Sequence, residues 1–212
     1  MEPHLTPAAL EAILESGLAE LDLPLDSAGA LAELAFLVSR WAERINLTAH
    51  RSPEAIARRL VIDAVALGQA LPATPPASLV DLGSGAGFPG LPLAILWPTC
   101  RITLVESRER KHHFQRTAIR TLGISNARAL RGRAEQLEAT PHQVVVAQAM
   151  AEPARVLEWM RRWVDPAGWL VLAQSDPIPT IAAPLNIRPV EPRRYQVPLG
   201  GPSRSLWLGQ LA

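Results

Sequence analysis

The stretch with the clearest chemical meaning runs from Val80 to Ile95 and reads VDLGSGAGFPGLPLAI. Its glycines follow an apolar run directly, and they are Gly83, Gly85, Gly87 and Gly90. Glycine lets the backbone approach a ligand closely and accepts conformations that other residues resist. A sharp turn between a strand and a helix is the alternative, but a turn alone rarely needs three glycines at alternate positions. The composition therefore favours a ligand-binding loop.

Two ligand classes fit the spacing of these glycines. Gly85, Gly87 and Gly90 match the dinucleotide fingerprint G-x-G-x-x-G, which would indicate a nicotinamide-dependent oxidoreductase. However, Asp81 precedes Gly83 by two residues and completes D-x-G-x-G-x-G, a pattern typical of S-adenosylmethionine (SAM) sites.

Pro89 also argues against a nicotinamide cofactor, because it removes a backbone donor from the helix start that would hold a pyrophosphate. SAM carries no phosphate, and its ribose and amino-acid ends need acidic or polar partners. The loop therefore favours SAM as the cofactor.

Acidic residues stand where those partners are needed. Asp81 lies beside the loop, and Glu106 ends the next apolar run, RITLVES, at the distance expected for a carboxylate that binds ribose hydroxyls. The alternative for Glu106 is an ion pair with Arg108 or Arg110. Further along, GRAEQL (Gly132–Leu137) is expected to lie over the adenine ring, which Ala134 and Glu135 would contact mainly through their backbone.

The first 70 residues predict helices that would flank this site. Thr6-Pro7 and Ser27 are candidate N-caps, and Ser52-Pro53 opens a helix expected to reach Ala70. The proline-rich segment LPATPPAS (Leu71–Ser78) is the clearest internal boundary. We therefore expect a helical extension over residues 1–71 and a main domain over 72–212, forming one compact unit.

After this boundary short apolar runs alternate with helical stretches, which indicates an α/β fold with parallel βαβ units. The expected strands are Leu79–Leu82, Ile102–Val105, Asn126–Arg131, Val144–Ala147 and Trp169–Ala173. The expected helices are Leu91–Trp97, Arg108–Leu122, Ala134–Glu138 and Pro153–Val164. Two further strands around the turn at Gly200–Pro202 are expected to form an antiparallel pair.

Composition sets wider limits on function. The chain has 212 residues and a formal net charge of +1, so bulk charge gives no argument for nucleic acid, although a local basic face is compatible with it. Its single cysteine, Cys100, excludes an internal disulfide and is expected to be buried. We find no signal peptide, membrane span or metal-ligand spacing, and we expect a cytoplasmic protein without a metal.

The segments NLTAHRSPEAIARRLVIDAVAL, VDLGSGAGFPGLPLAI, LVESRERKHHFQRT and GRAEQL occur in the order and spacing of a known family. From about Leu34 to Leu211 the chain resembles the bacterial small-subunit ribosomal RNA guanine-N7 methyltransferases, also called glucose-inhibited division protein B. Its most specific element is Phe88-Pro89-Gly90. The resemblance implies a class I SAM-dependent methyltransferase, Rossmann-like and with an N-terminal helical cap, that acts as a monomer on a guanine N7 of 16S ribosomal RNA.

The resemblance also implies site residues. The residues expected to bind SAM, taking the loop and the family together, are Gly83, Gly85, Phe88, Glu106, Ala134, Glu135 and Gln148. The chain departs from the family at several positions: Gln148 replaces an arginine, Gln174-Ser175 replaces lysine-glycine, and Leu60 and Ala64 replace histidine and serine. A second hypothesis is therefore a catalytically weakened member that still binds SAM or RNA.

Methylation at guanine N7 removes no proton from the substrate, so we expect no general base and no catalytic dyad. The rate would come from in-line positioning of N7 against the methyl carbon. RNA binding is expected to depend on arginine contacts to phosphate. The candidates are Arg51, Arg58, Arg59, Arg131 and Arg133.

Overall fold

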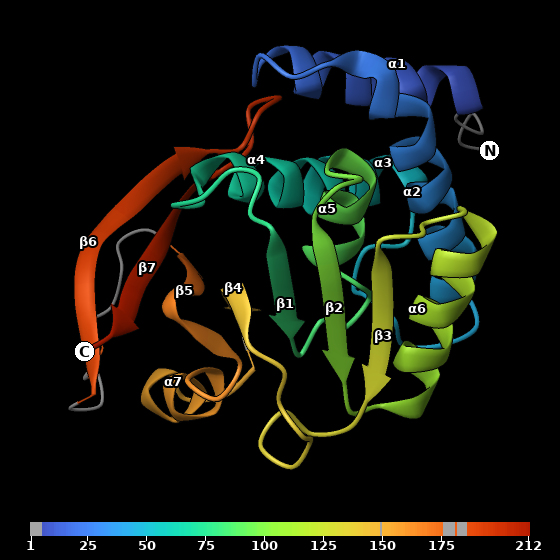
Figure 1. The fold of residues 1–212 in the computed structure, drawn as a ribbon. Helices are drawn as coiled ribbons and strands as arrows, with labels where there is room; N and C mark the ends of the chain where they lie inside the picture. The colour runs from blue at the N-terminus through green and yellow to red at the C-terminus, as the bar shows by residue number, and fades with distance from the viewer. Residues whose placement is uncertain (1–5, 149, 176–180, 182–185) are drawn as a thin grey trace.

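The structure of this chain is a computed structural model that describes residues 6–148, 150–175, 181 and 186–212 (Figure 1). The described strands form one seven-stranded sheet in the order β3-β2-β1-β4-β5-β7-β6. Their bounds are β1 Ser78–Leu82, β2 Arg101–Glu106, β3 Ala127–Arg131, β4 His142–Gln148, β5 Val164–Ser175, β6 Ile187–Gln196 and β7 Ser203–Leu211. The first five strands are parallel, and β7 runs antiparallel to both β5 and β6. The predicted parallel sheet and C-terminal antiparallel pair are confirmed.

Helices connect and cover these strands. Their bounds are α1 Pro7–Ala19, α2 Ala28–Ala42, α3 Pro53–Ile56, α4 Ile62–Ala70, α5 Gly90–Leu96, α6 Glu109–Thr121 and α7 Pro153–Met160. A π-helical turn over Ala57–Val61 joins α3 to α4, so the predicted helix from Pro53 to Ala70 is continuous. Thr6 and Ser52 cap α1 and α3 through their hydroxyl oxygens, as expected.

Two expectations about helices are wrong. Ser27 is itself helical and makes no capping hydrogen bond, because a short 3-10 turn over Leu25–Ser27 leads directly into α2. Residues 134–136 form a turn, and no helix is present over residues 134–138. The chain between β3 and β4 is an open loop (yellow in Figure 1).

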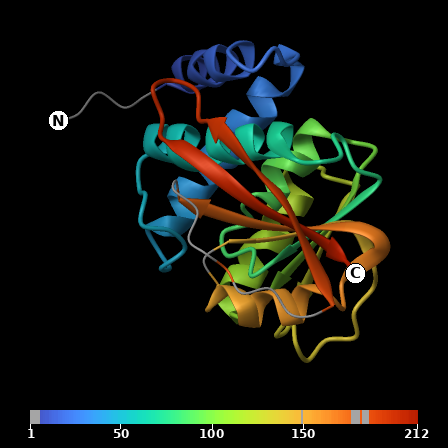
Figure 2. The same ribbon diagram turned by 90° about the vertical axis from the view of Figure 1, so that its left-hand side faces the viewer.

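Alternating side chains of the strands divide the core into two clusters. On one face of the sheet, Leu79 and Ile102 pack with α5, α6 and the N-terminal helices; on the other, Val80 and Val105 pack with α7. Figure 1 shows α7 and α6 on separate sides of the sheet, and Figure 2 shows β6 and β7 side by side at its edge. Burial of both faces explains why the central strands read as continuous apolar runs.

The N-terminal helices share a core with the sheet. Leu34 and Val38 of α2 belong to the same buried cluster as Leu79 of β1. The guanidinium of Arg193 on β6 donates to the carbonyl of Leu71 at 2.7 Å, which fixes the connector between α4 and β1. The division between residues 1–71 and 72–212 stays a prediction.

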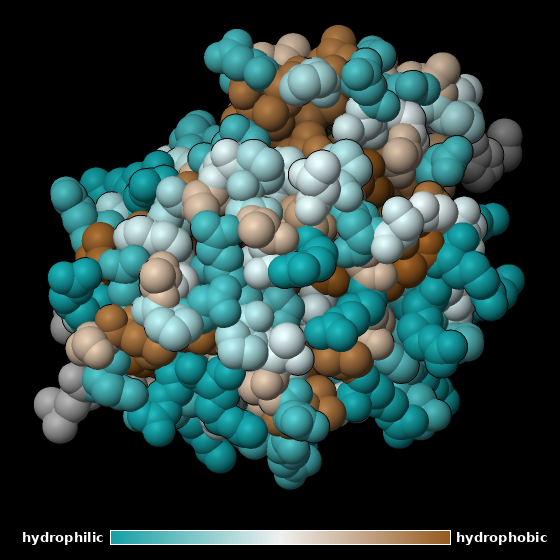
Figure 3. All heavy atoms as spheres, in the orientation of Figure 1, coloured by the Kyte–Doolittle hydropathy of each residue, from teal (hydrophilic) through white to brown (hydrophobic). Residues whose placement is uncertain are grey.

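On the face shown in Figure 3, hydrophilic residues alternate with smaller apolar areas. Among the described residues, Leu25 is an exposed large hydrophobic side chain, and Cys100 is fully buried as expected. None of the described helices is both long and apolar enough to cross a membrane.

Candidate functional site: the carboxyl edge of the parallel strands

The glycine loop is held against β2 by backbone hydrogen bonds. The amides of Gly83 and Ser84 both donate to the carbonyl of Val105, at 2.9 and 3.1 Å. Gly83 has φ +69°, and a Cβ atom there would lie 2.5 Å from Cγ of Met150. Glycine is therefore required at this position twice over, for the left-handed backbone and for the close approach of Met150.

Glu106 and Gln115 hold the next turn of the loop. The Glu106 carboxylate accepts from the Gly85 amide through Oε2 at 2.9 Å and from the Arg108 amide through Oε1 at 2.7 Å. On α6, the buried Gln115 amide donates to the Ser84 hydroxyl at 2.8 Å and to the Gly85 carbonyl at 2.9 Å. These bonds fix the loop before any ligand binds.

The alternative reading of Glu106, an ion pair with a neighbouring arginine, does not match this geometry. Its partner at Arg108 is the backbone amide, and the carboxylate is only 6% exposed. A carboxylate offers about four lone-pair sites, of which the Gly85 and Arg108 amides use two. Glu106 therefore keeps acceptor capacity for the hydroxyl groups of a ribose.

Asp81 lies beneath the loop rather than at its surface. It is 1% exposed, and its Oδ2 accepts from the Gly90 amide at 3.0 Å, which anchors the start of α5. Burial raises the pKa of Asp81 well above 3.8; the Gly90 hydrogen bond opposes the rise, and the charge of Glu106 adds to it. The expected contact of Asp81 with the amino-acid end of SAM stays a prediction, whereas its anchoring role is direct.

A first pocket opens beside the loop, where β1, β2 and β3 end. Its lining includes three of the predicted SAM residues, Gly83, Ala134 and Glu135, together with Val105, Met150 and Trp159. The combination of glycine backbone, apolar side chains and an aromatic ring suits a flat heterocycle. We call this the nucleoside pocket.

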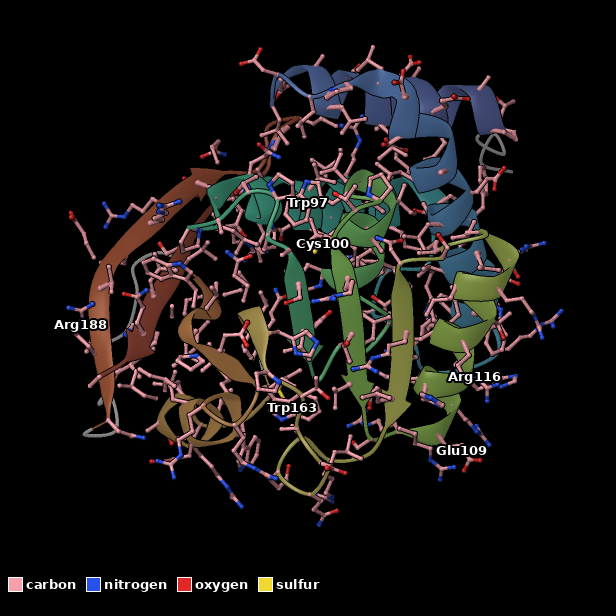
Figure 4. The ribbon with its side chains drawn as sticks, in the orientation of Figure 1. Trp97, Cys100, Glu109, Arg116, Trp163 and Arg188 are labelled. Atoms are coloured by element: carbon pink, nitrogen blue, oxygen red, sulfur yellow. The ribbon has the colours of Figure 1, made fainter. Side chains whose placement is uncertain are left out.

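Residues near α7 fix the far wall of the nucleoside pocket. The indole Nε1 of Trp163 donates to the Ala134 carbonyl at 3.1 Å, and the Arg162 guanidinium donates to the carbonyls of Glu135 and Leu137 at 2.6 and 3.2 Å. In Figure 4, Trp163 lies between α7 and the loop that follows β3. These hydrogen bonds hold the segment over residues 134–137 in place, where we had expected a helix.

A second pocket adjoins the first and shares Met150 with it. It lies at the ends of β4 and β5, and it is lined by Gln148, Gln174, Tyr195 and Arg204 among others. We call it the central pocket. The two glutamines that stand at the family's arginine and lysine positions thus line one space.

A third pocket lies between the glycine loop and α4, and it shares Gln148 and Arg204 with the central pocket. We call it the helical pocket; its lining also includes Arg59, Asp63 and Phe88. Of the predicted SAM residues, Phe88 and Gln148 therefore lie on this side, apart from Gly83, Ala134 and Glu135. Gly85 and Glu106 support the loop without lining any of the three pockets.

A polar cluster joins α4 to the C-terminal strands at these pockets. Asp63 accepts from the Tyr195 hydroxyl at 3.1 Å and from Nε and Nη2 of Arg204 at 3.3 and 3.1 Å. Burial, followed by the charge and hydrogen bond of Asp63, raises the pKa of Tyr195 well above its ordinary range. The tyrosine is therefore a neutral donor, and its acceptor Asp63 also holds the Arg204 guanidinium.

The predicted RNA-binding arginines differ in their surroundings. Arg58, Arg131 and Arg133 form ion pairs with Glu54, Glu109 and Glu135, at 3.0, 3.1 and 3.7 Å. Arg59 lines the helical pocket, and Arg51 is exposed. The structure therefore brings two of the five to the pockets at the sheet edge: Arg59 lines the helical pocket, and Arg133, which pairs with Glu135, lines the nucleoside pocket.

The fold and the glycine loop together define a class I, Rossmann-like methyltransferase. A SAM-dependent methyltransferase from Aquifex aeolicus superposes with a TM-score of 0.56 at 14% identity, covering 82% of this chain and 98% of that chain. A mutant of MtNAS solved in complex with S-adenosylmethionine has a TM-score of 0.60 at 16% identity, covering 97% and 89%. These likenesses concern the fold.

The family follows from sequence comparison. The family model described as rRNA small subunit methyltransferase G matches residues 28–177, and the chain belongs to that family. The ribosomal RNA small subunit methyltransferase G of Stenotrophomonas maltophilia K279a is 37% identical over 197 residues, covering 91% of this chain and 92% of the relative. The protein of that name from Chromohalobacter salexigens is 34% identical over 198 residues, covering 92% and 93%.

Three residues that support the site were missed by sequence reasoning. Gln115 lies in the family segment LVESRERKHHFQRT but was assigned no role there, and Met150 and Arg204 lie outside the glycine loop. For Arg204 a signal existed, because a polar SRS triplet opens a strand that is otherwise apolar. The position of Arg204 could not be predicted from the sequence. It depends on the pairing of β7 with β5, which sets Arg204 opposite Ser175 at the carboxyl edge of the sheet.

Proposed function

We propose that this chain transfers the methyl group of SAM to N7 of a guanine in 16S ribosomal RNA of the small subunit. The observation that carries the proposal is a preformed glycine loop beside three adjoining pockets in a chain of the rRNA small subunit methyltransferase G family. Ligands of open α/β sheets bind at the carboxyl ends of the strands, which is where these pockets lie.

The nucleoside pocket suits the adenosine part of SAM. Gly83 exposes its backbone to the pocket, and the backbone of Ala134 borders the pocket at a position fixed by Trp163. Glu106 retains lone pairs for the ribose hydroxyls, although it lies behind the loop. Bound SAM supplies an activated methyl group on a sulfonium, which is a good leaving group.

The central and helical pockets are proposed to receive the guanine and its phosphate. Gln148 offers a carboxamide that both donates and accepts hydrogen bonds, which suits a purine edge. Arg204 uses Nε and Nη2 on Asp63, so its Nη1 group is the part left to face an incoming ligand. In this arrangement the Arg204 guanidinium, paired with Asp63, stands next to Gln148 and Gln174, where the family has charged residues.

Such an arrangement is sufficient for the reaction because N7 of guanine carries no proton. The residues need only hold the base so that N7 lies in line with the methyl carbon, and no side chain has to accept a proton in the transfer step. The loss of charge at Gln148 and Gln174 would then affect RNA affinity more than the chemical step.

We further propose that the protein works as a cytoplasmic monomer, with the helical extension over residues 1–71 contributing one wall of the RNA site. Arg59 and Asp63, both on that extension, line the helical pocket together with Phe88 of the glycine loop. A substrate within the small ribosomal subunit places the activity in the cytoplasm.

Mass spectrometry of 16S ribosomal RNA from a deletion strain tests this proposal in the cell. We expect one 7-methylguanosine to be missing in the deletion strain and restored by the wild-type gene. A full complement of 7-methylguanosine in the deletion strain would contradict the proposal and favour the weakened member that only binds SAM or RNA.

A further inference from the structure

A fourth pocket, at the amino ends of the strands, belongs to no site described above. It has a volume of about 460 Å³ and opens on the sheet face that carries Val80, where the chain between β3 and β4 is a loop rather than a helix. Its polar lining includes Ser78, Arg101, Thr103, Arg128 and His142. We call it the amino-edge groove.

The pairing of the strands explains why these side chains share a face. Ser78 pairs with Arg101, and Thr103 pairs with Arg128, so all four point to the same side as Val80. His142 would point away with Val144, but the register shifts between these two residues. The imidazole lies against Thr103, whose hydroxyl is 3.0 Å from Nε2.

The groove carries two guanidinium groups that form no ion pair within the described residues. Among the described residues, the guanidinium of Arg101 makes no hydrogen bond or ion pair. That of Arg128 donates Nε to the Thr103 hydroxyl at 3.1 Å and forms no ion pair. No aspartate or glutamate lines the groove. Two guanidinium groups with unused N–H donors on one concave face match an anion with several oxygen atoms.

His142 adds an unsatisfied polar atom. The residue is 4% exposed, and its Nδ1 has no hydrogen-bond partner within the described chain. Because the Thr103 hydroxyl accepts from Arg128, it can donate its own proton to Nε2, which leaves the ring proton of the neutral imidazole on Nδ1. Burial lowers the pKa of His142, and the charge of Arg128 lowers it further; the carbonyls of Thr140 and Trp163 and the Asp165 carboxylate oppose this.

We propose that the amino-edge groove binds a phosphate group through Arg101 and Arg128. The phosphate comes either from the RNA backbone or from a free phosphate compound. The first source rests on the proposed function and would give the RNA a second contact at the opposite end of the strands from the methyl-transfer site. The second source is independent of that function.

The test uses the full chain and a variant that loses both charges, Arg101→Gln with Arg128→Gln. A matched control, Arg116→Gln with Arg120→Gln, removes the same charge from exposed positions on α6; Figure 4 shows Arg116 there. Titration with sodium phosphate at constant ionic strength is followed by NMR of the backbone amides. We expect saturable shifts at residues 101–103 and 126–128 in wild type and control. The groove variant should bind at least about tenfold more weakly, the loss expected for charge-assisted hydrogen bonds.

A second arm measures binding to 16S ribosomal RNA as a function of salt. If the phosphate belongs to RNA, the groove variant loses about one to two units of salt slope beyond the control. An unchanged slope with lost phosphate binding assigns the groove to a free phosphate compound. Absence of saturable shifts in wild type, or equal losses in the two variants, overturns the proposal. Methyl transfer by the same wild-type sample is scored separately, so failure of the proposed function leaves the phosphate result interpretable.

Discussion

At the scale of single residues, Glu106 connects the sequence pattern to the site. Its spacing from the glycine loop predicted a ribose contact, and the structure adds that its carboxylate also fixes the amide of Gly85. The same side chain thus positions the loop and keeps lone pairs for a ligand. Sequence spacing could not reveal that Glu106 positions the loop, because this hydrogen bond joins the loop after β1 to the end of β2.

Replacing Glu106 should therefore weaken SAM binding in two ways. We expect Glu106→Ala to lower the affinity about 10- to 100-fold, as one or two charge-assisted hydrogen bonds are lost. Glu106→Gln, which can still accept from Gly85, should lose less. Isothermal titration calorimetry measures both, with Glu109→Ala, an exposed acid on α6, as the control. A change below threefold for Glu106→Ala would refute the ribose contact.

Asp81 makes a pH-dependent contribution to stability. Burial raises its pKa in the folded state, so the folded protein holds this proton more tightly than the unfolded chain does. The stabilisation is fully present below the ordinary aspartate range, about pH 4, and is lost as the pH rises through the folded pKa.

Asp81→Asn removes this dependence, because the carboxamide stays neutral and its oxygen can accept from Gly90. We expect the free energy of unfolding of Asp81→Asn, relative to wild type, to increase from acidic to neutral pH. Urea unfolding across that range measures it, with the exposed Asp26→Asn as the control. A difference that stays constant with pH, or falls, would contradict the assignment.

At the scale of elements, the apolar runs predicted the order of the strands and helices. The runs are recognisable because both faces of the central strands are buried, so almost every residue in them is apolar. It was wrong for residues 134–138, where hydrogen bonds from Arg162 and Trp163 hold turns that no local pattern records. It also missed the coupling of β7 to α4 through Asp63. Contacts between residues more than 100 positions apart depend on topology, which a single sequence does not specify.

The Trp163 hydrogen bond offers a test of this element. Trp163→Phe keeps most of the buried ring but leaves the Ala134 carbonyl without its donor, which costs on the order of 1–3 kcal/mol of unfolding free energy. We also expect weaker SAM binding, since Ala134 borders the nucleoside pocket. Trp97→Phe, a buried tryptophan at the end of α5 far from the pocket, is the matched control for lost ring volume. Equal SAM affinities in the two variants would argue against the coupling.

At the scale of the whole molecule, the position of charged side chains in the fold matters more for the site than the net charge of the sequence. A net charge of +1 gives no argument for RNA binding, but the C-terminal strands bring Arg204 to the carboxyl edge, beside Gln148 and Gln174. The two glutamines are neutral where the family has charged residues, and the guanidinium that stands beside them is that of Arg204, paired with Asp63. The position of Arg204 beside these glutamines follows from the pairing of β7 with β5, which the sequence alone does not specify.

Arg204 should consequently matter for RNA and not for SAM. We expect Arg204→Gln to lower kcat/KM for methylation of small-subunit particles by about tenfold or more, while the Kd for SAM changes less than twofold. Arg188→Gln, on the outer edge of β6 in Figure 4, removes the same charge away from the pockets and should leave both constants unchanged. Equal effects of the two substitutions would contradict a role at the site.

The most direct measurement is methyl transfer by the purified chain from radiolabelled SAM to small-subunit particles that lack the modification. Nuclease mapping and mass spectrometry then identify the labelled nucleoside. We predict incorporation approaching one methyl group per particle, recovered as 7-methylguanosine at a single position of 16S ribosomal RNA. No incorporation, or label in protein or in another nucleoside, would contradict the account.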